Sequence, residues 1–285
     1  MAHTFENFEH SYWKNGKPIF APSEKGAAWG ERVKRKVAKL HKFEHFIYHF
    51  KDGSHVKALH NHRTNAFFCR VDIQRFFYSI RRNRVQRALK DIGIHKAEEF
   101  AKWSTVKNPY PGGGYVLPYG FIQSPILATL VLTASAVGNY LRSLNPAIIT
   151  VSVYMDDICL SSQNEAALWV AFEGLKASLE EAGFALNDEK TREPAKLIDI
   201  FNCSLENGTT EVLPERIEEF FSVERSEASI DGFETYVDIV KSHSWRSTRK
   251  QKRKRFVRVA AKAVGPFASN IAPSPAALIE PVDGR

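Results

Sequence analysis

Cysteine is rare in this chain, with only three residues (Cys69, Cys159 and Cys203) among 285. None of them has C-x-x-C spacing, which argues against both a disulfide scaffold and a zinc site. Each cysteine lies in an apolar, strand-like run, so we expect buried free thiols. The N-terminal residues also lack the basic and apolar regions of a secretion signal. Together these absences favour a reducing, cytoplasmic location.

Long apolar runs and internal repeats are also missing. The segment from Ser124 to about Leu144 has the length of a helix, and Pro125 is tolerated in its first turn. Thr, Ser and Asn interrupt this segment, so we expect no membrane span. A hydrophobic content of 44% nevertheless supports a substantial core. The length is suited to one large or two modest domains.

Acidic residues are absent from residues 246–258, which contain eight cations. These eight charges equal the net charge of the whole chain, +8. Such a patch binds phosphate without reading sequence, through the release of counterions. A solvated charged tail is the alternative, but Phe256 and Val257 favour a helix with one packed face. Two smaller basic stretches, 32–42 and 81–90, have a helical pattern and suit either a nucleic-acid channel or a solvated face.

Two adjacent carboxylates form a compact acidic feature in Tyr154-Met155-Asp156-Asp157. Short β-branched apolar runs flank the tetrad, a pattern that is typical of a hairpin with the acids at its turn. Paired carboxylates repel each other unless cations neutralise them. A chain of this length contains roughly one Asp-Asp pair by chance, usually in a solvated turn. The tetrad therefore needs a third carboxylate before it indicates a metal site.

Asp72 supplies that carboxylate at the end of the apolar run 67–73. An N-cap is the simpler interpretation of an aspartate before a helix-like segment. Alternatively, Asp72, Asp156 and Asp157 together suit two Mg²⁺ ions, for which Mn²⁺ is a common substitute. Two such ions stabilise the attacking and leaving oxygens of an in-line phosphoryl displacement.

At these residues the sequence resembles the reverse transcriptases. The Tyr154–Asp157 tetrad resembles their motif C, and Asp72 with the following Phe-Phe pair resembles motif A. Residues 117–125 (LPYGFIQSP) resemble motif B, and residues 183–191 (GFALNDEKT) resemble motif D. Residues 200–205 occupy the place of motif E but match it poorly. The four good matches occur in the family's order.

The resemblance implies an α+β, right-hand polymerase with a ferredoxin-like palm, compact fingers and a small helical thumb. The order strand, helix, hairpin, helix, strand is consistent with this palm. We expect the second helix to begin at a capping box of Ser162 and Glu165 and to end before Gly183. Residues 184–186 and 197–205 are the expected later strands. The predicted regions are 1–66 (N-terminal helices and fingers), 67–212 (palm, with a finger insertion near 81–116), 213–263 (basic thumb) and 264–285 (loose tail).

The resemblance also implies residue roles. The metal ligands are Asp72, Asp156, Asp157 and the main-chain carbonyl of Ile73. Phe77 corresponds to the aromatic residue that excludes a ribose 2′-hydroxyl, although core packing is its simpler role. Lys190 corresponds to a lysine that donates a proton near the leaving pyrophosphate. Further predicted contacts are Tyr119, Gly120 and Lys57 for the dNTP, and Tyr154, Met155, Arg249, Lys250, Lys252, Arg253, Lys254 and Arg255 for primer and template.

The chain also departs from common members of the family. Tyr119 replaces the usual motif B glutamine, and the chain shows no recognisable RNase H, maturase or endonuclease segment. Its plan is similar to stand-alone bacterial reverse transcriptases, which commonly partner a noncoding RNA. The Gly-Phe-Ile-Gln-Ser-Pro form of motif B favours an antiviral-defence enzyme over a retron enzyme that makes msDNA. A nucleic-acid-binding assembly subunit, template-independent or protein-primed synthesis, a protein partner and a homo-oligomer all stay open.

Overall fold

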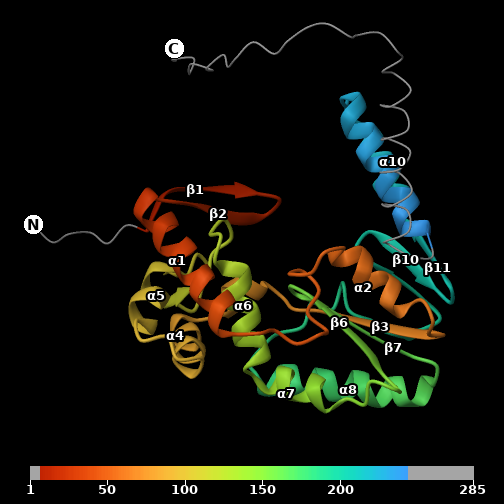
Figure 1. Ribbon diagram of the computed structural model, residues 1–285, viewed down its shortest axis with the longest axis horizontal. Coiled ribbons are helices and arrows are strands. Elements are labelled where there is room, and N and C mark those ends of the chain that lie inside the picture. The colour runs from red at the N-terminus through yellow and green to blue at the C-terminus, as the bar shows by residue number, and fades with distance from the viewer. Residues whose placement is uncertain (1–6, 243–285) are drawn as a thin grey trace, which may run out of the picture. The chain divides into compact units, whose positions relative to one another are not determined.

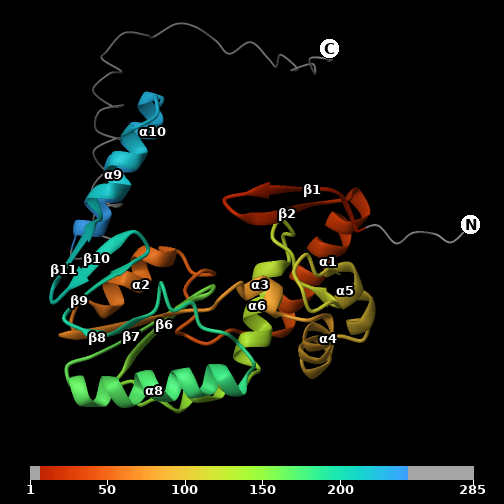
Figure 2. The same cartoon turned by 180° about the vertical axis from the view of Figure 1, so that it is seen from behind.

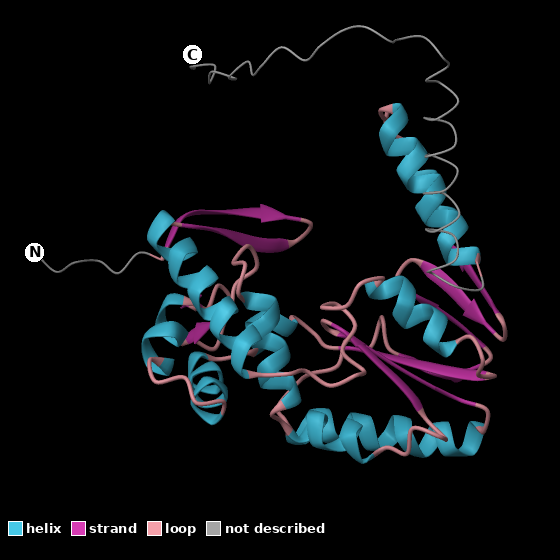
Figure 3. Cartoon of the chain, in the orientation of Figure 1, coloured by secondary structure: helices cyan, strands magenta, loops and turns pink. Residues whose placement is uncertain are grey.

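The computed structural model of the protein describes residues 7–242 (Figure 1). The predictions for residues 246–258 and 264–285, including the six basic template contacts, lie outside the described residues. The fold contains both helices and strands, partly in separate runs along the chain, and the paired strands of its sheets are antiparallel (Figure 3), which confirms the α+β class.

The helices are α1 (Glu24–Leu40), α2 (Ser54–His62), α3 (Phe76–Ser79), α4 (Arg82–Asp91), α5 (Ala97–Trp103), α6 (Ser124–Thr133), α7 (Ala136–Ser143), α8 (Glu165–Glu181), α9 (Pro214–Phe221) and α10 (Glu227–Lys241). The strands are β1 (Phe8–Lys14), β2 (Lys17–Pro22), β3 (Phe67–Asp72), β4 (Val106–Lys107), β5 (Tyr115–Val116), β6 (Thr150–Tyr154), β7 (Asp157–Ser162), β8 (Arg192–Ala195), β9 (Leu197–Ile200), β10 (Cys203–Glu206) and β11 (Thr209–Val212).

The central sheet has the strand order β6-β7-β3-β8, with every neighbouring pair antiparallel. Chain order and sheet order together are those of a ferredoxin-like fold, which confirms the predicted palm. The predicted strand at residues 184–186 was wrong, because the fourth palm strand is β8. Leu186 makes only an isolated bridge to Ile73, beside the end of β3.

Helices cover both faces of this sheet (Figures 1 and 2). On one face, α8 packs against β3 and β7 and also contacts α7. Its residues Leu168, Phe172, Leu175 and Leu179, which recur at helical spacing, are all at most 1% exposed. The other face contacts α2 through β6. Because both faces are covered, the polar groups of the site lie at the end of the sheet.

The predicted helix over 124–144 is two helices. Helix α6 ends at Thr133, Ser135 caps α7 by accepting the Val137 N–H, and the two axes are bent by 65°. Within residues 7–242, no single helix is long and apolar enough to cross a membrane. Only this bent pair has the required length and composition.

Hydrogen bonds cap both ends of α8. The predicted Ser162–Glu165 capping box was wrong, since the N-cap is Asn164, whose side chain accepts the Ala167 N–H. At the other end Gly183 has φ +69°, and the N–H of Phe184 donates to Leu179 O at 2.9 Å. This is the Schellman ending that a glycine at this position predicts.

The segment 197–205 is a hairpin rather than one strand. A turn at Phe201 and Asn202, both with positive φ, separates β9 from β10. With β11, these strands form a second sheet that packs against α10. All three cysteines are buried and free, as predicted.

The N-terminal residues form a hairpin, β1–β2, that the sequence analysis did not predict. Asn15 and Gly16 make its turn, and both have positive φ. The two basic stretches near 32–42 and 81–90 are helical as predicted, in α1 and α4.

Candidate active site

The three aspartates meet at one end of the palm sheet. Asp72 closes β3 and lies opposite Asp157, the first residue of β7. Asp157 also pairs with Tyr154 across the β6–β7 hairpin, so Met155 and Asp156 form the turn. The Ile73 N–H donates to Asp156 O at 3.1 Å, which ties this turn to β3. The N-cap interpretation of Asp72 was wrong, since α3 begins at Phe76.

Burial and repulsion from neighbouring carboxylates destabilise the charged forms of Asp156 and Asp157. Asp72 is only 3% exposed. Burial raises the pKa of Asp157 to about 6, with Arg70 opposing the rise and the charges of Asp156 and Asp72 adding to it. Burial also raises the pKa of Asp156, and the charge of Asp72 contributes to that rise. The site therefore has the properties of a cation-binding centre.

Arg70 is a cation of the chain itself at this centre, and sequence reasoning missed it. Its Nε donates to Asp157 Oδ1 at 2.7 Å, and its Nη2 lies 3.9 Å from Asp72 Oδ2. The signal was available, because residues two apart on a strand share a face and Arg70 precedes Asp72 by two positions.

Motif D supplies two further groups. The Asn187 side chain donates to Asp72 Oδ1 at 2.8 Å, and its backbone N–H donates to Asp72 O at 2.9 Å. Lys190 Nζ lies 3.8 Å from Asp72 Oδ2. The structure thus brings the predicted Lys190 to the aspartates and reveals Asn187 as an unpredicted partner of Asp72.

The predicted dNTP residues Phe77 and Tyr119 are in contact, with ring centroids 4.7 Å apart. Burial raises the pKa of the Tyr119 hydroxyl, and the charge of Asp156 adds to this rise. Gly120 has φ +100°, and a Cβ there would lie 2.1 Å from Phe20 O. Glycine is therefore required at residue 120 for β2 to approach the motif B loop.

Strand β2 brings an unpredicted lysine, Lys17, close to Tyr119. Lys17 Nζ lies 5.0 Å from the centroid of the Tyr119 ring, and its charge lowers the pKa of Asp156. An Asn-Gly pair immediately before Lys17 was the available hairpin signal. Lys57 lies on α2, where its charge adds to the effect of burial in lowering the pKa of Lys51. Its predicted contact with the triphosphate stays a prediction.

The two remaining motif C residues have different neighbours. The Tyr154 ring packs on Phe201 and His55, with centroids 5.3 and 5.9 Å away, and its hydroxyl accepts from Ser54 at 3.3 Å. Met155 has φ +58°, and its N–H donates to His49 Nδ1 at 3.3 Å. Their predicted contact with primer stays a prediction.

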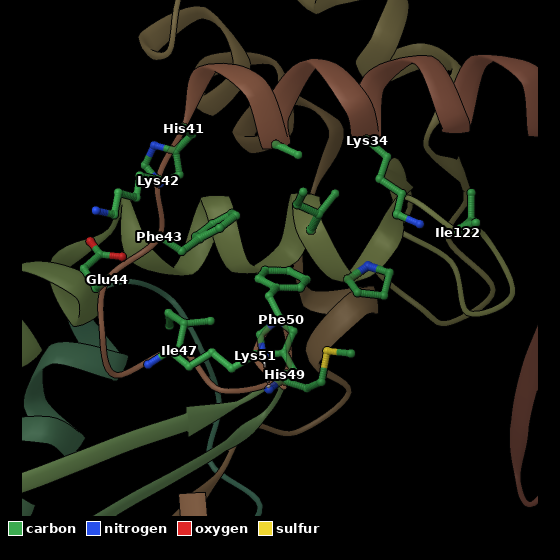
Figure 4. Close-up of a pocket in the computed structure, with 14 residues that line it drawn as sticks. Lys34, His41, Lys42, Phe43, Glu44, Ile47, His49, Phe50, Lys51 and Ile122 are labelled. Carbon is green, nitrogen blue, oxygen red and sulfur yellow. Dashed lines mark hydrogen bonds between the residues drawn. The ribbon is translucent and has the colours of Figure 1, made fainter. Parts of the chain in front are cut away.

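A pocket of about 640 Å³ lies beside this turn, between α1 and the palm (Figure 4). Phe43 and Phe50 give it an aromatic lining, and Lys34 and Lys42 lie along it.

Carboxylates are the hard oxygen donors that divalent cations prefer, and the raised pKa values are consistent with a site that needs added positive charge. As they stand, no three or more His, Cys, Asp or Glu side chains within residues 7–242 are grouped closely enough to hold a metal ion. Arg70 already bonds to Asp157 and lies near Asp72. Metal binding would therefore require these side chains to rearrange.

Comparison with known proteins gives a consistent result. The sequence profile described as "Reverse transcriptase (RNA-dependent DNA polymerase)" matches residues 28–202. Telomerase from Candida albicans, solved with a fragment of telomeric RNA, is similar with a TM-score of 0.50 and 11% identity, covering 66% of this chain and 38% of that one. A foamy viral protease–reverse transcriptase solved with double-stranded DNA has a TM-score of 0.46 and 17% identity, covering 76% and 32%. No curated protein sequence matches the chain.

The structural likeness, at such low identity, concerns the fold alone, and the chain spans about a third of the length of these solved proteins. The profile match is more informative, because it extends over more than half of the chain. It includes all three aspartates and the segments that pack around them. The chain therefore belongs to the reverse transcriptase (RNA-dependent DNA polymerase) family.

Proposed function

We propose that the protein is an RNA-directed DNA polymerase that adds deoxynucleotides to a primer 3′-hydroxyl. The convergence of Asp72, Asp156 and Asp157 at one end of the sheet carries this proposal. Simple nucleic-acid binding does not require three converging carboxylates. With Mg²⁺ or Mn²⁺ bound, such a site supplies charge neutralisation for the attacking and leaving oxygens.

The chain's own residues have distinct parts in this proposal. Asp72 and Asp156 would hold the ions, assisted by the Ile73 carbonyl, and Asp157 would join them if its bond to Arg70 were released. Besides Arg70, which bonds to Asp157, the cations Lys17 and Lys190 lie near these carboxylates, so they suit contacts with the triphosphate. Lys190 Nζ holds a proton that the leaving pyrophosphate can accept.

Phe77 and Tyr119 form one aromatic wall of the proposed nucleotide pocket. In this role Phe77 excludes the ribose 2′-hydroxyl, and Tyr119 supports its ring. Phe77→Ala should therefore relax discrimination against ribonucleotides, measured as the ratio of kcat/KM for dNTP and rNTP. An unchanged ratio would remove Phe77 from this role.

Primer extension tests the proposed activity directly. Purified protein should extend a primed RNA template in Mg²⁺, and Asp156→Ala with Asp157→Ala should abolish extension. The paired change Glu180→Ala with Glu181→Ala is a matched control, since it also removes two adjacent acids but from the exposed end of α8. Binding without incorporation in Mg²⁺ or Mn²⁺ would instead favour a nucleic-acid-binding assembly subunit.

We further propose that the enzyme serves antiviral defence together with a noncoding RNA. The form of motif B, Gly-Phe-Ile-Gln-Ser-Pro, supports this proposal over a retron enzyme. Sequencing the RNA and DNA that co-purify from cells would test it. A covalent RNA–DNA product resembling msDNA would favour the retron alternative, and DNA lacking any template match would indicate template-independent synthesis.

A further inference from the structure

His49 connects the motif C turn to the motif B helix. It lies in the loop between α1 and α2, and its two ring nitrogens contact different elements. Nδ1 lies 3.3 Å from the Met155 nitrogen in the turn, and Nε2 lies 2.8 Å from Thr129 Oγ1 in α6. Thr129 is 1% exposed, so its hydroxyl is sheltered from water.

The hydrogen bonds determine which nitrogen carries the proton. The Thr129 hydroxyl donates to Pro125 O at 2.9 Å, so its oxygen accepts from His49 Nε2–H. His49 Nδ1 is then free to accept the Met155 N–H. Burial lowers the pKa of His49 to about 4, although the Val153 backbone opposes this shift, which is consistent with a neutral ring. The chain of hydrogen bonds from the Met155 N–H through His49 and Thr129 to the Pro125 carbonyl therefore pairs each donor with an acceptor.

The backbone fixes the position of His49. The Tyr48 N–H donates to Val153 O at 2.9 Å, and the Val153 N–H donates to Phe46 O at 2.8 Å. These bonds attach the loop to β6 immediately before the turn. These main-chain bonds of the residues just before His49 therefore hold its imidazole in place. Figure 4 shows His49 beside the pocket.

The turn requires such support because Met155 has φ +58°, a conformation that costs a residue with a side chain roughly 1–2 kcal/mol. Among the described residues, His49 is the hydrogen-bond acceptor of its N–H. The next residue is Asp156. A shift of this turn would move one of the three carboxylates.

We propose that His49 is a positioning residue for Asp156, acting through the Met155 N–H and braced by Thr129. This inference rests on the proposed polymerase function. It assigns His49 no contact with substrate or metal. Losing its acceptor should therefore lower kcat without weakening nucleotide or primer–template binding.

Two amide substitutions separate the roles of the ring nitrogens. In His49→Asn, the side-chain oxygen can take the place of Nδ1 and accept the Met155 N–H. In His49→Gln, the longer amide reaches the place of Nε2 and Thr129, but leaves the Met155 N–H without an acceptor. His45→Gln is the matched control, because His45 is exposed in the same loop.

We expect His49→Gln to lower kcat about tenfold, corresponding to the loss of one hydrogen bond at a strained turn. His49→Asn should stay within about threefold of the wild type, and His45→Gln should be unchanged. The KM for dNTP and the Kd for primer–template should stay within about twofold in all three. Equal losses in the Asn and Gln variants would overturn the proposal, because they would indicate a packing role only.

Hydrogen–deuterium exchange provides a readout that does not depend on activity. The peptide covering residues 150–158 should exchange faster in His49→Gln than in the wild type or in His49→Asn. If His49→Gln fails to fold, Thr129→Val removes the brace and should produce the same change with a smaller amplitude. Wild-type exchange and wild-type kcat in a folded His49→Gln protein would overturn the inference. An inactive wild type would contradict the proposed function instead, and exchange would still test the positioning of the turn.

Discussion

The palm sheet holds two groups of polar residues with opposite electrostatic character. One group, the proposed catalytic end, comprises Arg70, Asp72, Asp156 and Asp157. The serine–histidine cluster, where α2 packs on β6 and β7, comprises His62, Asn65, Ser152 and Ser161, each at most 8% exposed. Both ring nitrogens of His62 lie 2.7 Å from a serine hydroxyl, one on Ser161 and the other on Ser152.

The two groups differ in how completely they are satisfied. Burial lowers the pKa of His62 to about 3, so the serine–histidine cluster is neutral and its hydrogen bonds close internally. At the catalytic end, burial raises the pKa of two carboxylates, and Arg70 compensates only in part. A neutral network in which every polar group has a hydrogen-bond partner stabilises the fold. A group of carboxylates whose negative charge is only partly neutralised favours the binding of a cation. One part of the sheet thus contributes to stability, and another carries the proposed catalytic residues.

Asp72→Asn should have the largest effect, a loss of activity at the proposed catalytic end. The amide keeps the size of the side chain but removes a metal-binding charge. We expect primer extension to fall on the order of a thousandfold. The melting temperature should stay the same or rise, because repulsion between the carboxylates decreases. A large loss of thermal stability would show that Asp72 is structural.

His62→Leu should have the opposite effect and act on stability. It leaves the Ser152 and Ser161 hydroxyls without their histidine partner in a buried site, at a cost of about 3 kcal/mol. Urea unfolding would measure this loss. Adding Ser152→Ala should recover part of it, since the Ser152 hydroxyl is then gone, whereas Ser161 keeps the hydrogen bond that it accepts from the Asn65 side chain. Full stability in the single variant would mean that the cluster contributes little.

The difference between the groups also explains what the sequence could predict. The three aspartates were predictable, because a hairpin turn and a strand end are local patterns and the family's motifs occur in order. The serine–histidine cluster was not, since α2 and β6 are separated by about ninety residues, as His62 and Ser152 show. Nothing local distinguishes a serine that faces a histidine from one that faces water.

Two further differences between sequence and structure have the same cause. Lys17 was not predicted from the sequence, and its strand reaches Tyr119 through a β-bridge between Ile19 and Tyr119. The triphosphate contact of Lys57, which the resemblance implies, stays a prediction. The predicted single helix over 124–144 missed a break because Ser135 caps a new helix in the middle of an apolar run. In the first case the pairing of distant residues, and in the second the Ser135 cap, determined the structure more strongly than local composition did.

Lys17 and Lys57 can be compared directly, since the structure places Lys17 near Tyr119 and the sequence predicted Lys57 as the triphosphate contact. Lys17→Ala should raise the KM for dNTP about tenfold with a smaller change in kcat, because it removes a charge near the proposed triphosphate position. Lys57→Ala should leave the KM nearly unchanged. Steady-state extension on a primed template would measure both. The reverse pattern would restore Lys57 to the role that the sequence predicted.

The smallest expected effect is the pH dependence of stability at Asp157. Its folded pKa of about 6 lies above its ordinary value of 3.8, so the folded state binds the proton more tightly. This contribution to stability is complete below about pH 3.8 and is lost as the pH rises through about 6. Asp157→Asn should thus match the wild type near pH 4 and exceed its stability by about 1 kcal/mol at pH 8.

Melting temperatures of both proteins in EDTA, from pH 4 to 8, would measure this difference. The contributions of the histidines are common to both proteins and cancel. Arg70 loses part of its partner in the variant, which reduces the expected gain. A variant that is less stable than the wild type at pH 8 would show that the Arg70–Asp157 ion pair outweighs burial and repulsion. The catalytic end would then stabilise the fold as the serine–histidine cluster does, and the distinction between the two groups would fail.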